Sequence, residues 1–199
     1  MNLPVMLAPA DSLLVRAVQA GDRAAFADIV RRHQDTVYRL CLRWLGDQAQ
    51  AEETAQDVFL AVFRALPAFR GESSLRTWIL RVAVNHCKNA RGYRQRRAWG
   101  RHDPLVHPDD PARSRDLPDP APHPDVRVGD AQRRAHLHAA LQDLDEDLRI
   151  LVVLRDVEDL DYEEIAQVLD LPRGTVKSRL HRARGLLAER LRFILQETP

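Results

Sequence analysis

Residues 159–187, DLDYEEIAQVLDLPRGTVKSRLHRARGLL, decide how the C-terminal half of the chain folds. Asp161 and Glu164 have the spacing of a capping box, and they precede a short helix with an apolar side at Ile165, Val168 and Leu169. Segment 170–174, Asp-Leu-Pro-Arg-Gly, ends that helix, and Thr175 is expected to cap a longer one. A short helix, a tight turn and a basic helix together predict a helix-turn-helix.

The longer helix has an apolar side and a side rich in hydrogen-bond donors. Its apolar positions are Val176, Leu180, Ala183, Leu187, Leu191 and Ile194. In a helix-turn-helix the second helix enters the major groove, where long donors reach base edges and phosphates. The candidates for duplex DNA binding are Arg173, Thr175, Lys177, Ser178, Arg179, His181, Arg182 and Arg184. The alternative is a basic amphipathic helix that packs in a hairpin without touching DNA.

Apolar side chains elsewhere recur every three or four residues, which predicts helices, and no stretch alternates as a strand would. The expected helices cover 12–20, Asp22 to Gly46, 51–66, a stretch beginning after Ser73 or Ser74, 137–144 and 148–154. The fold class is therefore all-α, with an N-terminal helix bundle of about 90 residues.

A proline-rich stretch separates the two halves. Seven of the twelve prolines fall within 103–130, and their fixed φ angles and missing donors forbid a helix there. The chain is expected to hold an N-terminal helical domain at 10–100, a Pro-rich linker at 101–130 and a helix-turn-helix domain at 131–197.

The composition is that of a globular protein. Of 199 residues, 45% are hydrophobic and 30% charged, and no apolar run approaches the length needed to cross a bilayer, so we expect a soluble protein without membrane insertion. The N-terminus lacks the basic start of a signal peptide, which favours the cytoplasm. Cys41 and Cys87 stand far apart without partners at metal-binding spacing, so buried thiols are expected.

Charge is segregated along the chain although the net charge is only +1. Residues 88–101 hold six Lys or Arg and no acid, and residues 173–192 hold seven against Glu189 alone. Residues 143–164 hold ten Asp or Glu. Two basic stripes predict two separate polyanion contacts, whereas the alternative is two ordinary solvated helix faces.

The first basic stripe is interleaved with aromatic residues over 68–101. Phe69, Trp78, Tyr93 and Trp99 alternate with arginines and lysines, a combination that suits unstacked single-stranded bases as well as duplex phosphate. Trp78 also lies on an apolar stripe, so a place in the core is the alternative for its ring.

Catalytic patterns are absent from the sequence. His136 and His138 are alternate residues that face different directions on a helix, and no metal-binding, nucleophile or phosphate-loop motif occurs. We therefore expect no enzyme activity, no metal and no cofactor.

Two long segments resemble the extracytoplasmic-function (ECF) group of bacterial sigma factors in the sigma-70 family. AEETAQDVFLAVFRALPAFRGESSLRTWILRVAVNHCKNARGYRQRR, residues 51–97, is similar to region 2 of that family. LDEDLRILVVLRDVEDLDYEEIAQVLDLPRGTVKSRLHRARGLL, residues 144–187, is similar to region 4.

The resemblance implies a role for each group of residues. The acidic helix of region 2 docks on the clamp coiled coil of core RNA polymerase, and the matching positions are Glu52, Glu53, Gln56 and Asp57. In that family the next loop and helix separate the strands of promoter DNA and capture a base of the −10 element. The matching positions here are Phe69, Arg70, Ser73, Ser74, Arg76, Trp78, Asn85, Lys88 and Arg91. Region 4 reads the −35 element through Arg173 to Arg184. An anti-sigma factor is a further implied partner.

The chain departs from the resemblance at one place. Many relatives carry two aromatic residues just before the Thr-Trp pair, whereas Leu75 and Arg76 stand here. Leu75 could still act as a wedge between bases and Arg76 could hold a phosphate. The alternative to the sigma-factor interpretation is a stand-alone helix-turn-helix regulator whose N-terminal bundle senses a signal or dimerises.

Overall fold

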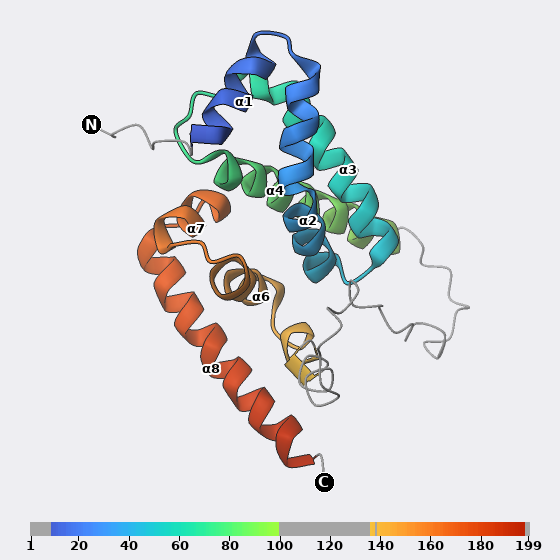
Figure 1. Ribbon diagram of the computed structural model, residues 1–199. Coiled ribbons are helices and arrows are strands. Elements are labelled where there is room, and N and C mark those ends of the chain that lie inside the picture. Colours follow the sequence, from blue (N-terminus) through green and yellow to red (C-terminus); the bar gives the residue numbers. More distant parts are fainter. Residues whose placement is uncertain (1–8, 100–135, 138, 198–199) are drawn as a thin grey trace, which may run out of the picture.

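The computed structural model describes residues 9–99, 136–137 and 139–197, and all the regular structure in these ranges is helical (Figure 1). The elements are α1 (Pro9–Gln19), α2 (Arg23–Leu45), α3 (Gln48–Ala65), η1 (Leu66–Ala68), α4 (Leu75–Trp99), α6 (Glu146–Val152), η3 (Val153–Val157), α7 (Tyr162–Leu169) and α8 (Arg173–Glu197). The all-α prediction is confirmed. The Pro-rich linker predicted at 101–130 lies outside the described residues.

Helix α2 and helix α3 pack against each other, and the caps at their adjoining ends keep the connection between them short. The Asp22 carboxylate accepts hydrogen bonds from the backbone N–H groups of Ala24 and Ala25, as predicted. Gly46 ends α2 in the left-handed conformation at φ 69°, which glycine adopts without strain. Asp47 then caps α3, so only two residues separate the helices.

The core of the N-terminal half lies between α2, α3 and α4. Ile29, Leu40, Val58 and Ile79 are among its fully buried members. Cys41 and Cys87 are buried free thiols, as expected, and their sulfur atoms lie 3.6 Å apart.

The helix-turn-helix of the C-terminal half forms with one correction to the prediction. Asp161 and Glu164 make the complete capping box of α7, and Asp170 ends that helix at φ 55°. Helix α8 begins at Arg173, so Thr175 is not its cap but lies within its first turn, where its N–H bonds to the Pro172 carbonyl at 2.8 Å. The Pro172 carbonyl also accepts from the Val176 N–H at 3.1 Å, so the first helical turn closes on Pro172 and the helix starts before Thr175.

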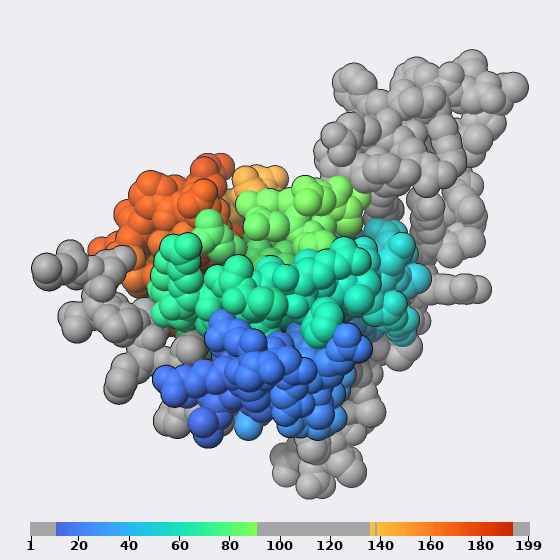
Figure 2. Space-filling model, turned by 90° about the horizontal axis from the view of Figure 1, so that it is seen from above, coloured from blue at the N-terminus to red at the C-terminus, as the bar shows by residue number. Residues whose placement is uncertain are grey.

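The two halves pack against each other along α4. Helix α7 lies on α4, α6 approaches α2, and the buried apolar residues of both halves form one continuous core. Figure 2 shows the C-terminal helices (orange) directly against the N-terminal half (green). None of the helices that the structure describes is both long and apolar enough to cross a bilayer.

Candidate functional site

Helix α8 presents a basic face to solvent. Val176, Leu180 and Ala183 are buried and fix the rotation of the helix. The opposite face therefore carries exposed side chains at Arg173, Lys177, Ser178, His181 and Arg182. Cationic side chains and hydroxyl or imidazole groups in the first half of a long helix are suited to phosphates and base edges.

Three other candidates on α8 are less available for contact with DNA, because they are half-buried or paired within the protein. Thr175 and Arg179 are half-buried. Arg184 forms an ion pair with Asp156 of η3, and the hydrogen bond to Asp156 raises the pKa of the Arg184 guanidinium. Arg184 therefore fastens α8 to η3, which the sequence alone did not indicate.

The loop between η1 and α4 is anchored at both ends. At its start, the Gln19 side-chain amide donates to the carbonyl oxygens of Leu66 and Phe69, at 3.3 and 3.1 Å. At its end, Ser74 Oγ accepts from the Thr77 N–H at 3.0 Å and so caps α4. Between these anchors Arg70 is exposed and Ser73 is half-buried.

A strip of side chains runs along one side of α4 from this loop. Phe69 packs on Trp78 with ring centroids 4.9 Å apart. The exposed side chains of Arg81, Asn85 and Lys88 follow Trp78 at intervals of three or four residues, so all four lie on one face, which spans about 15 Å. We call Trp78, Arg81, Asn85 and Lys88 the α4 strip. The side chain of Arg91 lies outside the described residues.

Leu75 and Arg76, the two departures from the family pattern, are both engaged within the protein. Leu75 is fully buried, so the expected wedge is wrong for this conformation. The Arg76 guanidinium donates to the Glu158 carboxylate at 3.0 Å, from one half of the chain to the other.

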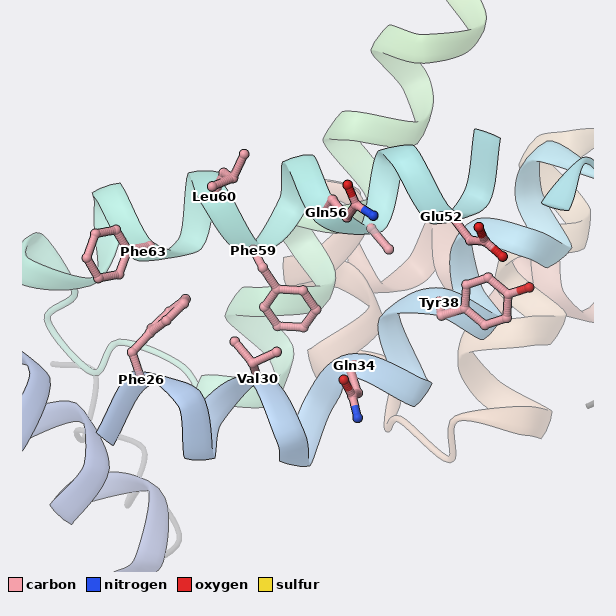
Figure 3. A pocket seen from close by; sticks show the side chains of 10 residues that line it. Phe26, Val30, Gln34, Tyr38, Glu52, Gln56, Phe59, Leu60 and Phe63 are labelled. Carbon is pink, nitrogen blue, oxygen red and sulfur yellow. The ribbon is translucent and has the colours of Figure 1, made fainter. Parts of the chain in front are cut away.

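Helix α3 carries an acidic face beside an apolar groove. Glu52, Glu53, Gln56 and Asp57 are all exposed. A groove of about 680 Å³ runs between α2 and α3, with Glu52 and Gln56 toward one end and with Phe26, Val30, Tyr38, Phe59, Leu60 and Phe63 among its lining residues (Figure 3). Leu60 is 53% exposed and Phe63 40% exposed.

The sequence did not reveal this groove. Phe26 and Phe63, which both line it, touch edge to face with their ring centroids 4.9 Å apart. Leu60 was the available signal in the sequence. It lies off the buried face of α3, which includes Ala55, Val58 and Val62, and it therefore widens the apolar surface beyond what the bundle covers.

Within the described part of the chain, no three His, Cys, Asp or Glu side chains come together as a metal site. His136 is half-buried, and His138 lies outside the described residues. The candidate surfaces in the described part of the chain are two basic faces, on α4 and α8, and one acidic face beside an apolar groove, on α3.

Comparison with known proteins matches each half of the chain to a different region of one family. Residues 29–98 match Sigma-70 region 2 and residues 134–187 match Sigma-70 region 4. The chain is 35% identical over 192 residues to RNA polymerase sigma-H factor of Pseudomonas aeruginosa, covering 94% of this chain and 96% of that protein. It is 32% identical over 186 residues to ECF RNA polymerase sigma-E factor of Escherichia coli K12, with the same coverage.

Solved structures share the fold. CnrH, in complex with the cytosolic domain of CnrY, matches with a TM-score of 0.64 at 23% identity, over 96% of this chain and 99% of that one. The sigma factor RpoE of Bartonella quintana, in complex with the anti-sigma factor NepR, matches with a TM-score of 0.64 at 21% identity, over 84% and 96%. A chain with Sigma-70 region 2 in its N-terminal half and Sigma-70 region 4 in its C-terminal half has the organisation of a sigma factor. The chain belongs to the sigma-70 family, in its ECF group.

Proposed function

We propose that this chain binds core RNA polymerase and directs it to promoters through two DNA contacts. The α4 strip, together with Phe69 in the loop before it, binds the −10 element as a single strand. Helix α8 binds the −35 element as a duplex. The observation that carries the proposal is the α4 strip together with Phe69, because the Phe69–Trp78 ring pair lies at the start of a helix face that also carries an amide and two cations. Stacking surface with adjacent cations is what unpaired bases require.

We assign the polymerase contact to α3 and the groove beside it. An acidic helix face next to an exposed apolar groove complements an amphipathic helix with basic and apolar residues. The clamp coiled coil of core polymerase is the proposed partner, and it would contact Glu52, Glu53, Gln56 and Asp57 together with the groove.

In the C-terminal half the duplex contact rests on Arg173, Lys177, Ser178, His181 and Arg182, which are the exposed members of the predicted set apart from the ion-paired Arg184. Arg184 supports them by holding α8 in place through Asp156. We propose domain limits of 10–100 and 131–197, joined by a linker at 101–130.

The remaining roles follow from the same proposal. The chain supplies specificity and catalyses no reaction itself, since the polymerase performs the chemistry. It acts in the cytoplasm, where promoter DNA and polymerase are. An anti-sigma factor is a proposed regulator, because the similar proteins CnrH and RpoE of Bartonella quintana were solved with CnrY and with the anti-sigma factor NepR.

Reconstitution with core polymerase tests the proposal against the stand-alone regulator. Purified chain and core enzyme are incubated with a library of promoter fragments, and run-off transcripts are mapped. The proposal expects discrete start sites that require the added chain. A regulator instead binds duplex fragments without core polymerase and produces no transcript, which would overturn the proposal.

A further inference from the structure

The side chain of Gln19, at the C-terminal end of α1, holds the start of the loop that carries Phe69. Its Nε2 donates to the carbonyl oxygen of Leu66 at 3.3 Å and to that of Phe69 at 3.1 Å. Leu66 begins the short turn η1, and Phe69 is the residue directly after that turn. One amide, from a residue 47 and 50 positions earlier in the chain, therefore bridges both ends of η1.

Gln19 has a fixed place because α1 is packed firmly on α2. Val15 and Val18, on the inner side of α1, are both buried. The turn that follows Gln19 leads directly into α2, since the N–H of Asp22, the cap of α2, donates to the Ala17 carbonyl at 2.9 Å. The Gln19 amide therefore reaches the loop from a rigid support.

The contact with Phe69 fixes the point at which the chain leaves η1. The N–H of Phe69 donates to the Leu66 carbonyl at 3.1 Å, and the extended conformation of Phe69, with ψ 123°, leads the chain out of the turn. Because the Phe69 carbonyl accepts from Gln19, the peptide group between Phe69 and Arg70 is held in one orientation. Phe69 is thus held twice, by Gln19 through its backbone and by Trp78 through its ring.

A loop with a fixed conformation is an advantage for a stacking site. Ordering a loop or a side chain at the moment of binding costs free energy, so a ring that already has its orientation binds an unpaired base more tightly. Ser74 fixes the far end of this loop by capping α4. Gln19 supplies the matching side-chain contacts at the near end, next to Phe69.

We propose that Gln19 is a positioning residue of the −10 site, which fixes the loop so that the Phe69 ring is ready to stack on an unpaired base. The inference rests on the proposed function, because the base is that of the −10 strand. Glutamine suits this role because its amide nitrogen carries two N–H donors, one for each carbonyl. Helix α1 thereby belongs to the −10 site, although it precedes residue 29, where the match to Sigma-70 region 2 begins.

The test replaces Gln19 with methionine in the full chain. Methionine is unbranched, has a similar helix propensity and donates no hydrogen bond, and Gln19 is exposed, so the core stays intact. Gln48→Met is the matched control, because Gln48 is an exposed glutamine of α3 whose Nε2 donates to Oε1 of Glu52 at 3.0 Å. Fluorescence anisotropy measures the affinity for a single-stranded oligonucleotide with the −10 sequence of a promoter found by reconstitution.

We expect Gln19→Met to weaken binding of this strand by about three- to tenfold, the loss that one or two ordinary hydrogen bonds account for. Gln48→Met should bind as wild type does, and the affinity of Gln19→Met for the −35 duplex should not change. In a chain that also carries Phe69→Ala, Gln19→Met should cause little further loss, because the ring that Gln19 positions is gone.

The double substitution separates positioning from a purely structural role. An equal loss from Gln19→Met with and without the Phe69 ring would overturn the proposal, because the effect would then not pass through Phe69. Wild-type affinity in the folded Gln19→Met chain would also overturn it.

Gln19→Glu is a second variant, which keeps the test valid if Gln19→Met fails to fold. Its side chain has the shape of glutamine but no N–H donor at neutral pH, so it should also weaken strand binding. Gln48→Glu controls for the added charge, and an equal loss in both would overturn the proposal. If the wild-type chain itself fails to bind the −10 strand, the proposed function fails instead.

Discussion

Phe69 lies against Trp78 with their ring centroids 4.9 Å apart and their planes inclined at 42°. The pair joins the loop that follows η1 to the first turn of α4, and both rings are only half-buried. Each ring therefore keeps surface for a further flat partner, and each already has a fixed orientation.

We predict that Phe69→Ala weakens binding of the single-stranded −10 oligonucleotide by about 1–3 kcal/mol, the range found when a stacking aromatic is removed. Fluorescence anisotropy titration with a labelled oligonucleotide measures the affinity of each variant. Phe63→Ala is the matched control, because Phe63 lines the groove of α3 and not the α4 strip. An equal loss in both variants would show that a general loss of packing, not stacking on a base, is responsible.

Asn85→Ala should reduce stable promoter opening while leaving polymerase binding and −35 recognition nearly unchanged. The reason is that flipping a base out of the duplex costs a few kcal/mol of unstacking. The protein must offset that cost by stacking on the base and by hydrogen bonds to it, and Asn85 is the proposed hydrogen-bonding residue. Permanganate reactivity of unpaired thymines measures opening. Asn89→Ala, one turn further along α4, is the control, and full reactivity of a stable Asn85→Ala variant would exclude Asn85 from base capture.

Glu53→Lys combined with Asp57→Lys should weaken binding to core polymerase severalfold without changing the fold. Both side chains are exposed, so reversing their charge alters the α3 surface and leaves the core intact. Fluorescence anisotropy with labelled chain gives the affinity. Asp35→Lys combined with Glu189→Lys makes the same change of charge elsewhere, and if it weakens binding equally, the effect is one of net charge and not of α3.

Substitutions in α8 should separate base contact from phosphate contact. Arg182→Ala is expected to cost about 1–3 kcal/mol on the −35 duplex if Arg182 reads a base with two hydrogen bonds. Lys177→Ala should lower the slope of log affinity against log salt by about one unit, with little change in sequence preference. If neither substitution alters duplex binding, α8 does not enter the groove.

His33 makes the stability of the protein depend on pH. Burial lowers the pKa of His33 below its ordinary value of 6.5, with Arg76 and Arg32 adding to the effect and Asp11 opposing it. Because the unfolded chain takes up a proton first, the contribution of neutral His33 to stability is complete above pH 6.5. It declines as the pH falls from there toward the lower pKa of the folded state. Denaturant unfolding at pH 7.5 and 5.5 should show the decline in wild type and a smaller one in His33→Gln.

Local features of this fold were predictable from the sequence because their determinants lie a few residues apart. Asp22, Gly46 and the Asp161–Glu164 box act on the backbone next to them, and each is present as predicted. The prediction for Thr175 failed because the first helical turn closes on the Pro172 carbonyl, and spacing alone does not show which of two neighbouring residues begins a helix.

Contacts between distant residues could not be predicted in this way. Arg76 and Glu158 are 82 residues apart, and the acidic run that contains Glu158 has the composition of a solvated surface. A wedge between bases was one possible role for Leu75, but Leu75 is fully buried. The exposed candidates on α8 were found because amphipathic spacing distinguishes outward from inward positions within one helix. Those on α3 followed from the resemblance to the sigma-70 family, and those on α4 from the interleaving of aromatic and basic residues together with that resemblance.

The buried thiols of Cys41 and Cys87 provide a built-in probe of how often the N-terminal core opens. The Cys87 thiol donates a hydrogen bond to Cys41, and this bond together with burial raises the pKa of Cys87 well above its usual range. Alkylating reagents attack the thiolate, which the folded chain withholds at neutral pH. The rate of alkylation in the unmodified protein therefore reports how often α2 and α4 part, without any introduced label. Comparing the alkylation rate of the protein alone with its rate in the presence of core polymerase would show whether polymerase binding makes the N-terminal core open more often.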